Sequence, residues 1–356
     1  MNAIGAPSST AIALRGPEEI PSRIEAWESA LAPAGRVALS YDSRWLLALR
    51  DGLDHVPYAF EAVRSDKVVG LLPLCFLKSR LFGRFLVGLP YLNYGGVQAD
   101  DVDVAAALVD AAVELASRLN VRYLELRHER ELAHAALTEK RTSKVHMRLT
   151  LPGHQDELWK QLSPKVRNLV RKGEQHDLAV AWGRNELLDA FFDVFSHNMR
   201  DLGTPTFGRK LFQSILEQFP DEAEMCVVRS AGRAVAAALL LHGRGTTEVP
   251  SASSLREFQS TSANMLMYWQ LLCRAIERGQ TTFDFGRSSE ESGTYRFKKQ
   301  WGAEPHPAVW QYHVRQGSIG DMRPESGKFR LMIKCWQRLP LGVSRWLGPK
   351  IVRGIP

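Results

Sequence analysis

The sequence lacks an apolar run that could cross a membrane, and it lacks any pair of cysteines at a metal-binding or redox spacing. A membrane-spanning helix needs about 18 or more consecutive apolar residues, and the first residues lack the basic start and apolar centre of a secretory signal. The four cysteines lie far apart, at Cys75, Cys226, Cys273 and Cys335. These absences predict a cytoplasmic protein with buried free thiols, no disulfides and no metal site.

Acidic residues are absent from the last part of the chain. Residues 328–356 contain seven basic residues and no acidic one, whereas the rest of the chain has equal numbers of the two. The net charge of +7 therefore belongs to this tail. A neutral body argues against a nucleic-acid-binding surface spread over the whole protein.

Apolar and basic residues of the tail separate onto two faces of a helix predicted over 329–339. The apolar face carries Phe329, Met332, Ile333 and Trp336, and the basic face carries Arg330, Lys334 and Arg338. Such a helix binds either an anionic membrane surface or the protein's own core. Both alternatives stay open, and the first would place the protein at the inner face of the cytoplasmic membrane.

The body of the chain repeats one order of elements. A length of 356 residues, with 45% hydrophobic and 24% charged residues, is typical of a soluble protein of two domains. Two segments each run through a hairpin, a loop, a helix and a strand. The hairpins lie at 59–77 and 225–243, the helices at 102–119 and 261–278, and the closing strands at 121–126 and 281–285. The similar spacing predicts two copies of one α/β unit.

The segment 283–301 combines a strand end with polar residues. A buried strand ends in Gly286-Arg287-Ser288, and a polar loop leads to a short helix with Tyr295 and Lys298. Ligands of open α/β folds bind at such strand ends. Asp284 faces away from its two phenylalanine neighbours, so it either accepts a proton from an amine, orients a lysine or pairs with an arginine. Arg287 is suited to bind an anion.

Three further segments carry candidate binding residues. In the helix that begins at Ser163 and Pro164, Lys165, Arg167 and Arg171 form a basic cluster that either grips an anion or faces solvent. Near a helix end at Gly203, Asn198 and Arg200 serve either capping or binding. The loop with Tyr91, Asn93 and Tyr94, followed by two glycines, predicts a cleft lining or a tight turn.

The order of elements and three of these motifs resemble the FemAB/FemX peptidyltransferases of the GNAT superfamily. The pair Phe297-Lys298 matches their phenylalanine–lysine pair, and the helix at 163–172 is similar to their S-P-K-x-R-x-x-x-R-K helix. The segment 198–205 resembles the exosortase (PEP-CTERM)-associated branch. The resemblance covers residues 41–312 and implies an α/β (α+β) fold of tandem GNAT-like domains, each a mixed sheet with flanking helices.

The resemblance also implies domain limits. The chain is expected to divide into an N-terminal extension at 1–20, a first GNAT-like domain at 21–150, a second at 151–320 and the basic amphipathic tail at 321–356. The boundary falls near a Leu-Pro-Gly-His sequence that breaks the strand pattern.

The resemblance implies transfer of an aminoacyl or acyl group onto an amine of a cell-envelope precursor, peptidoglycan or exopolysaccharide. Lys298 is then expected to stabilise the carbonyl oxygen of the transferred group, with help from Tyr295. Asp284 is the expected proton acceptor, and Arg287 and Ser288 are expected to bind the substrate.

The donor stays open between aminoacyl-tRNA and acyl-CoA. Coenzyme-A-dependent GNAT proteins hold pyrophosphate on a glycine-rich turn, and the corresponding segment 257–264 has no glycine. This favours aminoacyl-tRNA, although the chain has no long heptad stretch for the coiled-coil arm of some Fem ligases. The alternatives are a CoA-dependent N-acyltransferase that uses Ser260 and Thr261, and a non-catalytic module that binds a glycan or a lipid-linked precursor.

Overall fold

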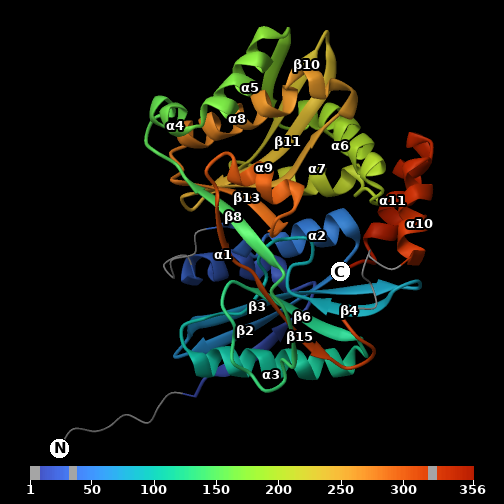
Figure 1. Cartoon of the computed structure of the whole chain (residues 1–356). Coiled ribbons are helices and arrows are strands. Elements are labelled where there is room, and N and C mark those ends of the chain that lie inside the picture. Colours follow the sequence, from blue (N-terminus) through green and yellow to red (C-terminus); the bar gives the residue numbers. More distant parts are fainter. Residues whose placement is uncertain (1–8, 32–37, 320–326) are drawn as a thin grey trace, which may run out of the picture.

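Two β-sheets with the same strand order form the body of the protein (Figure 1). The computed structural model describes residues 9–31, 38–319 and 327–356. The first sheet has the order β1 (Ala11–Arg15), β2 (Val56–Arg64), β3 (Lys67–Ser79), β4 (Gly83–Val87), β6 (Tyr123–His128), β15 (Val309–Val314) and β7 (Glu139–Arg141), with β5 (Gln98–Ala99) paired to β3. The second has the order β9 (Leu178–Gly183), β10 (Ala223–Ser230), β11 (Arg233–Gly243), β12 (Thr246–Ser254), β13 (Thr282–Ser289), β8 (Lys144–Thr150) and β14 (Glu304–Pro307).

The strand directions repeat as well. In each sheet the fourth and fifth strands are parallel, β4 to β6 and β12 to β13. Every other neighbouring pair along the two sheets is antiparallel. The predicted hairpins form β2–β3 and β10–β11, so the structure confirms the predicted repeat.

The two halves exchange one strand each. β8 follows β7 in the chain but lies in the second sheet between β13 and β14, and β15 follows β14 but lies in the first sheet between β6 and β7. A strand that precedes the predicted domain boundary at 150 therefore belongs to the second sheet, and a strand that follows it belongs to the first. β1 pairs with β2 although it falls within the predicted extension at 1–20. Alternating side chains indicate that a segment is a strand, but they do not indicate which sheet has room for it.

Helices cover both sheets (Figure 1). The helices are α1 (Ile20–Leu31), α2 (Trp45–Leu53), α3 (Val102–Arg118), α4 (Gln155–Gln161), α5 (Pro164–Gln175), α6 (Leu188–Leu202), α7 (Arg209–Gln218), α8 (Ala263–Glu277), α9 (Gly293–Lys299), α10 (Gly327–Gln337) and α11 (Leu341–Val352). Short 3₁₀ turns lie at η1 (Leu39–Tyr41), η2 (Asn185–Leu187) and η3 (Arg256–Thr261). As predicted, Ser163 caps α5 and Gly203, at a φ of 77°, ends α6.

One hydrophobic cluster is shared by the two halves. It contains buried side chains of α1 and α2, such as Trp27 and Trp45, and buried side chains of the second half, such as Phe191 and Phe212. Helices α2 and α7 pack closely, since a Cβ atom on Gly52 would lie 2.7 Å from the Cα atom of Leu211. The two sheets are therefore held by a common core rather than by a surface contact.

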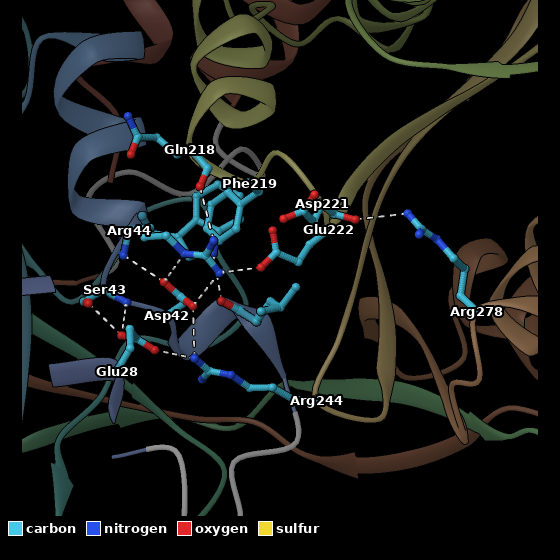
Figure 2. Close-up of polar contacts among 12 residues, drawn as sticks. Glu28, Asp42, Ser43, Arg44, Gln218, Phe219, Asp221, Glu222, Arg244 and Arg278 are labelled. Carbon is cyan, nitrogen blue, oxygen red and sulfur yellow. Dashed lines mark hydrogen bonds and ion pairs between the residues drawn. The ribbon is translucent and has the colours of Figure 1, made fainter. Parts of the chain in front are cut away.

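An ion-pair network ties the halves together beside this core (Figure 2). Asp42, which is 1% exposed, accepts hydrogen bonds from Arg44 and from Arg244 on the turn between β11 and β12, the latter at 3.0 Å. Arg244 also pairs with Glu28 of α1, and Arg44 pairs with Glu222 at 2.8 Å. We call these five residues the interdomain network. It fixes the turn at η1 against the second sheet.

The tail packs on the body. Both α10 and α11 contact α6, Ile333 lies against Gly203, and Nε of Arg345 donates to Oγ of Ser196 at 2.8 Å. The predicted docking on the protein's own core is therefore observed for one face of the tail. The side chains of Lys328, Phe329 and Arg330 lie outside the described residues.

The cysteine and membrane expectations have separate outcomes. Cys75, Cys226 and Cys273 are buried free thiols, as predicted, whereas Cys335 is an exposed one. Within the described ranges, no helix has the length and apolar character that a membrane span requires.

Replacing Phe212 by Ala should lower the free energy of unfolding by about 3–5 kcal/mol, because its ring contacts Phe191 and Phe195 at centroid distances of 4.8 and 4.9 Å in the shared core. Denaturant unfolding followed by circular dichroism measures this, and a single shifted transition is expected because both halves share that core. Leu81→Ala, at a side chain that is 78% exposed, is the control. Separate transitions for the two halves would contradict the common core.

Candidate active site between the two domains

A cavity of about 360 Å³ opens where β12 and β13 separate. Their last paired residues are Glu248 and Asp284. Both halves of the chain line the cavity, the first with Ser40, Trp45, Tyr91, Leu92, Asn93 and Lys144, and the second with Leu241, Glu248, Val249, Pro250, Ala252, Tyr268, Phe285, Gly286, Arg287, Thr294 and Lys298. The sequence-based expectation of a ligand site beside Gly286 thus coincides with a cavity.

Lys298 reaches the cavity from α9. The Nζ atom donates hydrogen bonds to the carbonyl oxygens of Gly286 at 3.1 Å and Arg287 at 2.9 Å. Burial lowers the pKa of Lys298 to about 8. An ammonium group has three donors, so one N–H remains for a ligand. Gly286 has a φ of 75° at an irregularity between β13 and β8, which aims these carbonyls at the lysine.

Glu248 is the functional candidate that the sequence reasoning missed. It is 3% exposed, and its carboxylate accepts hydrogen bonds from the backbone N–H of Ser40, at 2.8 Å, and from the Ser40 hydroxyl. Burial and the nearby charge of Asp284 raise the pKa of Glu248 to about 7. The only signal in the sequence is a single acidic residue in an otherwise uncharged strand, β12.

Asp284, predicted as a proton acceptor, does not line the cavity. Its Oδ2 accepts a hydrogen bond from the Tyr94 hydroxyl at 2.6 Å and lies 3.5 Å from Nε of Arg148. Its Oδ1 accepts the N–H of Gly286 at 2.7 Å. The observed contacts are those of the alternative role, pairing with an arginine, and Asp284 also holds the backbone at Gly286.

The loop at 91–96 forms the wall that the first half contributes. Asn93 lines the cavity, and the Tyr91 hydroxyl bonds with Nε2 of His55 at 3.0 Å. Arg127, buried in β6, donates to the carbonyl oxygen of Leu92 at 2.7 Å. Tyr94 is fully buried beneath the wall and does not line it. The loop is thus a braced wall, and the cleft-lining interpretation fits its geometry.

The remaining predicted site residues lie outside this cavity. They are Ser288, Tyr295, Lys165, Arg167, Arg171, Asn198 and Arg200. Ser288 is buried on the opposite side of β13 from Arg287, and Tyr295 packs on the core of the second half. Asn198 donates to Oγ of Ser253 at 3.1 Å, and Arg200 pairs with Asp201 at 2.7 Å.

The basic cluster of α5 lies on the outside of the second half. Lys165 and Arg171 are exposed, and the Arg171 guanidinium lies over the Trp159 ring at 5.5 Å. For Lys165 and Arg171 this arrangement is that of the solvent-facing alternative, whereas Arg167 is half-buried and its Nε atom is buried without a hydrogen-bond partner. A role in binding an anionic substrate stays a prediction for these residues.

A second cavity, of about 220 Å³, lies at the start of α8. Ser262, at a φ of 57°, precedes the helix. The Thr261 hydroxyl donates to the carbonyl oxygen of Phe258 at 2.7 Å and accepts the N–H of Ala263 at 3.3 Å. Thr261 therefore occupies one of the first free amides of α8 and leaves fewer donors for a phosphate there.

Comparisons with known proteins agree with this architecture. Residues 160–299 match the family model of the acetyltransferase (GNAT) domain. The crystal structure of FemX has 16% sequence identity and a TM-score of 0.59, with 76% of this chain and 91% of FemX covered. L-PGS from Bacillus licheniformis has 13% identity and a TM-score of 0.53, with 95% and 100% covered.

A tandem GNAT protein from the clavulanic acid biosynthesis pathway has 12% identity and a TM-score of 0.55, with 87% of this chain and all of that chain covered. The search of curated proteins found no match. At these identities the similarity is one of fold. The chain has a tandem GNAT-like fold, as predicted, and the match to the GNAT domain model lies in its second half.

Replacing Ser40 by Ala should raise the pKa of Glu248 above its value of about 7, because the lost hydroxyl stabilises the ionised carboxylate. Asp284 and Arg148, the other charges that act on Glu248, are unchanged. Carboxyl carbon shifts of ¹³C-glutamate-labelled protein, followed through a pH titration, measure this pKa.

Ser43→Ala is the matched control, because the Ser43 hydroxyl lies on the same turn but donates to Glu28 at 2.6 Å. This variant should leave the Glu248 titration in place. An equal shift in both variants, or none in Ser40→Ala, would contradict direct stabilisation by Ser40.

Proposed function

We propose that the protein is an acyltransferase that moves an aminoacyl or acyl group onto an amine of a cell-envelope precursor, with Lys298 and Glu248 as its catalytic residues. The observation that carries this proposal is that both groups line one cavity with pKa values shifted in opposite directions. Paired groups of this kind assign the acid and base roles in many enzymes. The cavity also lies beside Phe297-Lys298, the pair that resembles the FemX motif.

The proposed reaction proceeds by direct attack of the acceptor amine on the donor carbonyl. Ionised Glu248 accepts one proton as the C–N bond forms. The free N–H of Lys298 donates to the oxyanion of the tetrahedral intermediate. The bond from the acyl carbon to the leaving oxygen or sulfur then breaks, and the leaving group takes up the proton from Glu248. The products are an amide and the free donor alcohol or thiol.

Aminoacyl-tRNA is the proposed donor. The hydroxyl of Thr261 is occupied at the start of α8, which weakens a coenzyme A pyrophosphate site there. Fold neighbours include a lysylphosphatidylglycerol synthetase domain from Agrobacterium fabrum, at 10% identity and a TM-score of 0.55, whose name joins an amino acid to a lipid headgroup. The acceptor is a separate question. An exopolysaccharide precursor is one proposed acceptor, and its support is the similarity of segment 198–205 to the exosortase-associated branch.

The CoA-dependent alternative is favoured by one observation, the cavity at the start of α8. Calorimetric titration with acetyl-CoA distinguishes the two donors. No saturable binding is expected, and charged tRNA should instead support transfer. Micromolar binding of acetyl-CoA would replace aminoacyl-tRNA as the proposed donor.

Replacing Glu248 by Gln, or Lys298 by Ala, should lower kcat by about 100-fold or more, because each loses one of the two catalytic groups. Single-turnover transfer of a radiolabelled aminoacyl group from tRNA to an amine acceptor measures this. Lys299→Ala, at the adjacent exposed lysine, is the control. Full turnover by Lys298→Ala would exclude its role.

The rate should depend on pH as a bell-shaped curve. It should rise as pH passes about 7, because Glu248 is a base only when it is ionised. It should fall above about 8, because Lys298 then loses its proton and its charge. Glu248→Gln should remove the rise at acidic pH from the residual rate. An unchanged acidic limb in this variant would assign the base to another group.

We further propose that the outer face of the tail contacts an anionic membrane. Leu331, Met332 and Trp346 are exposed, at 65%, 60% and 65%, and Leu202 lies exposed at the end of α6, on which the tail packs. The exposed side chains of Lys334, Arg338 and Lys350 accompany them, and residues 328–356 contain no acidic residue. Apolar side chains with basic neighbours suit the surface of a membrane with anionic lipids. This location would bring a cytoplasmic enzyme to lipid-linked precursors.

Replacing Leu331 and Trp346 together by Glu should abolish cosedimentation with phosphatidylglycerol liposomes, because both exposed side chains become anionic. Liposomes of phosphatidylcholine should bind neither protein. Val102→Glu, at a 77%-exposed side chain that begins α3, is the control. Point variants are preferable to removal of 328–356, because α10 and α11 cover α6. Equal binding by the double variant would refute this contact.

A further inference from the structure

Arg287 lines the cavity without a counter-charge. Its side chain makes no hydrogen bond and no ion pair among the described residues, and its Nε atom is buried without a hydrogen-bond partner. Leaving a guanidinium partly buried and unpaired costs free energy, so such groups are usually matched by a carboxylate or a phosphate. None of the described residues supplies such a partner for Arg287.

A tryptophan from the exchanged strand holds this guanidinium in place. The Arg287 guanidinium carbon lies 3.6 Å from the centre of the Trp310 ring, and that of Arg127 lies 3.9 Å from it. Arg127 is neutralised, since Nη2 lies 2.7 Å from the Glu125 carboxylate. The two arginines therefore share one aromatic ring, but Arg287, unlike Arg127, has no carboxylate partner in the described ranges.

Two lysines add to the positive charge. Lys144, at the start of the exchanged strand β8, and Lys298 line the same cavity, and neither makes an ion pair in the described part of the chain. Loss of hydration and the charge of Arg287 lower the pKa of both. Glu248 is the one carboxylate among the described lining residues, and Ser40 binds both of its oxygens. The described lining residues of the cavity thus include three cations and one carboxylate.

We propose that Arg287 and Lys144, beside Lys298, form a subsite for an oxyanion, a carboxylate or phosphate group carried by the substrate. The planar guanidinium, whose carbon lies 3.6 Å from the centre of the Trp310 ring, presents the fork of donors that binds such groups through two parallel hydrogen bonds. The proposal deepens the proposed function, since it names a substrate whose anionic group lies close to the reacting amine or acyl carbon. A neutral amine would leave this charge unpaired.

Isothermal titration calorimetry of the full chain with pyrophosphate, and separately with succinate, tests this subsite. Saturable binding of at least one anion is expected, and Arg287→Gln should weaken it by tenfold or more. Arg287→Lys should retain part of the affinity, since it keeps the charge and loses the fork. Preference for pyrophosphate assigns a phosphate, and preference for succinate a carboxylate. Arg118→Gln, at an exposed arginine in the last turn of α3, is the matched control.

Absence of saturable binding by the wild type, or equal binding by Arg287→Gln, would overturn the subsite. Circular dichroism melting of each variant separates loss of binding from loss of fold, and Arg287→Lys provides a folded, charged comparison. Binding without any transfer would leave the subsite standing and reject the transferase. Transfer by Arg287→Gln with an unchanged KM for the anionic substrate would support the transferase and reject the subsite.

Discussion

The exchange of β8 and β15 between the sheets is the constraint on which the site depends. β15 carries Trp310 into the first sheet, where the ring supports Arg287 of the second. β8 begins with Lys144 at the same cavity and carries Arg148 to Asp284. Without this exchange, β8 would lie in the first sheet and β15 in the second, so Lys144, Arg148 and Trp310 would each lie in the opposite sheet. The shared core around Trp45 and Phe212 then holds the two walls at a fixed separation.

The electrostatics of the cavity follow from this sharing. The interdomain network fixes the turn at η1, and the turn supplies the Ser40 donors that bind Glu248 from across the interface. Asp284 lies behind Glu248, so its negative charge and the burial of the site disfavour ionisation of Glu248. Lys298 is instead held by two carbonyl oxygens of the adjacent strand. The Glu248 carboxylate and the Lys298 side chain are thus supported by different halves of the chain.

The tail packs on the body through one of its faces. Ile333 and Arg345 contact α6, which accounts for one face. Leu331 and Trp346 remain exposed on the described part of the tail, beside lysines and arginines. The amphipathic pattern of the sequence was therefore compatible with docking on the body and with a second contact. The sequence showed that the helix has an apolar face and a basic face. It did not show which of these faces packs on the body.

Local features of the chain were predictable because they depend on neighbouring residues. The turn at Gly286, the helix carrying Lys298, the cap at Ser163 and the repeated hairpins all follow from propensities and spacing over a few residues. The mutual placement of the cavity residues did not follow, since Ser40 and Glu248 are 208 positions apart and meet only through the interface. The sequence by itself determined the two α/β units, the short helix of Lys298 and the basic tail. Only the tertiary structure decided that Glu248 and Lys298 line one cavity, that Asp284 pairs with Arg148, and that Arg287 has no partner among the described residues, because burial and charge pairing depend on contacts between the two halves.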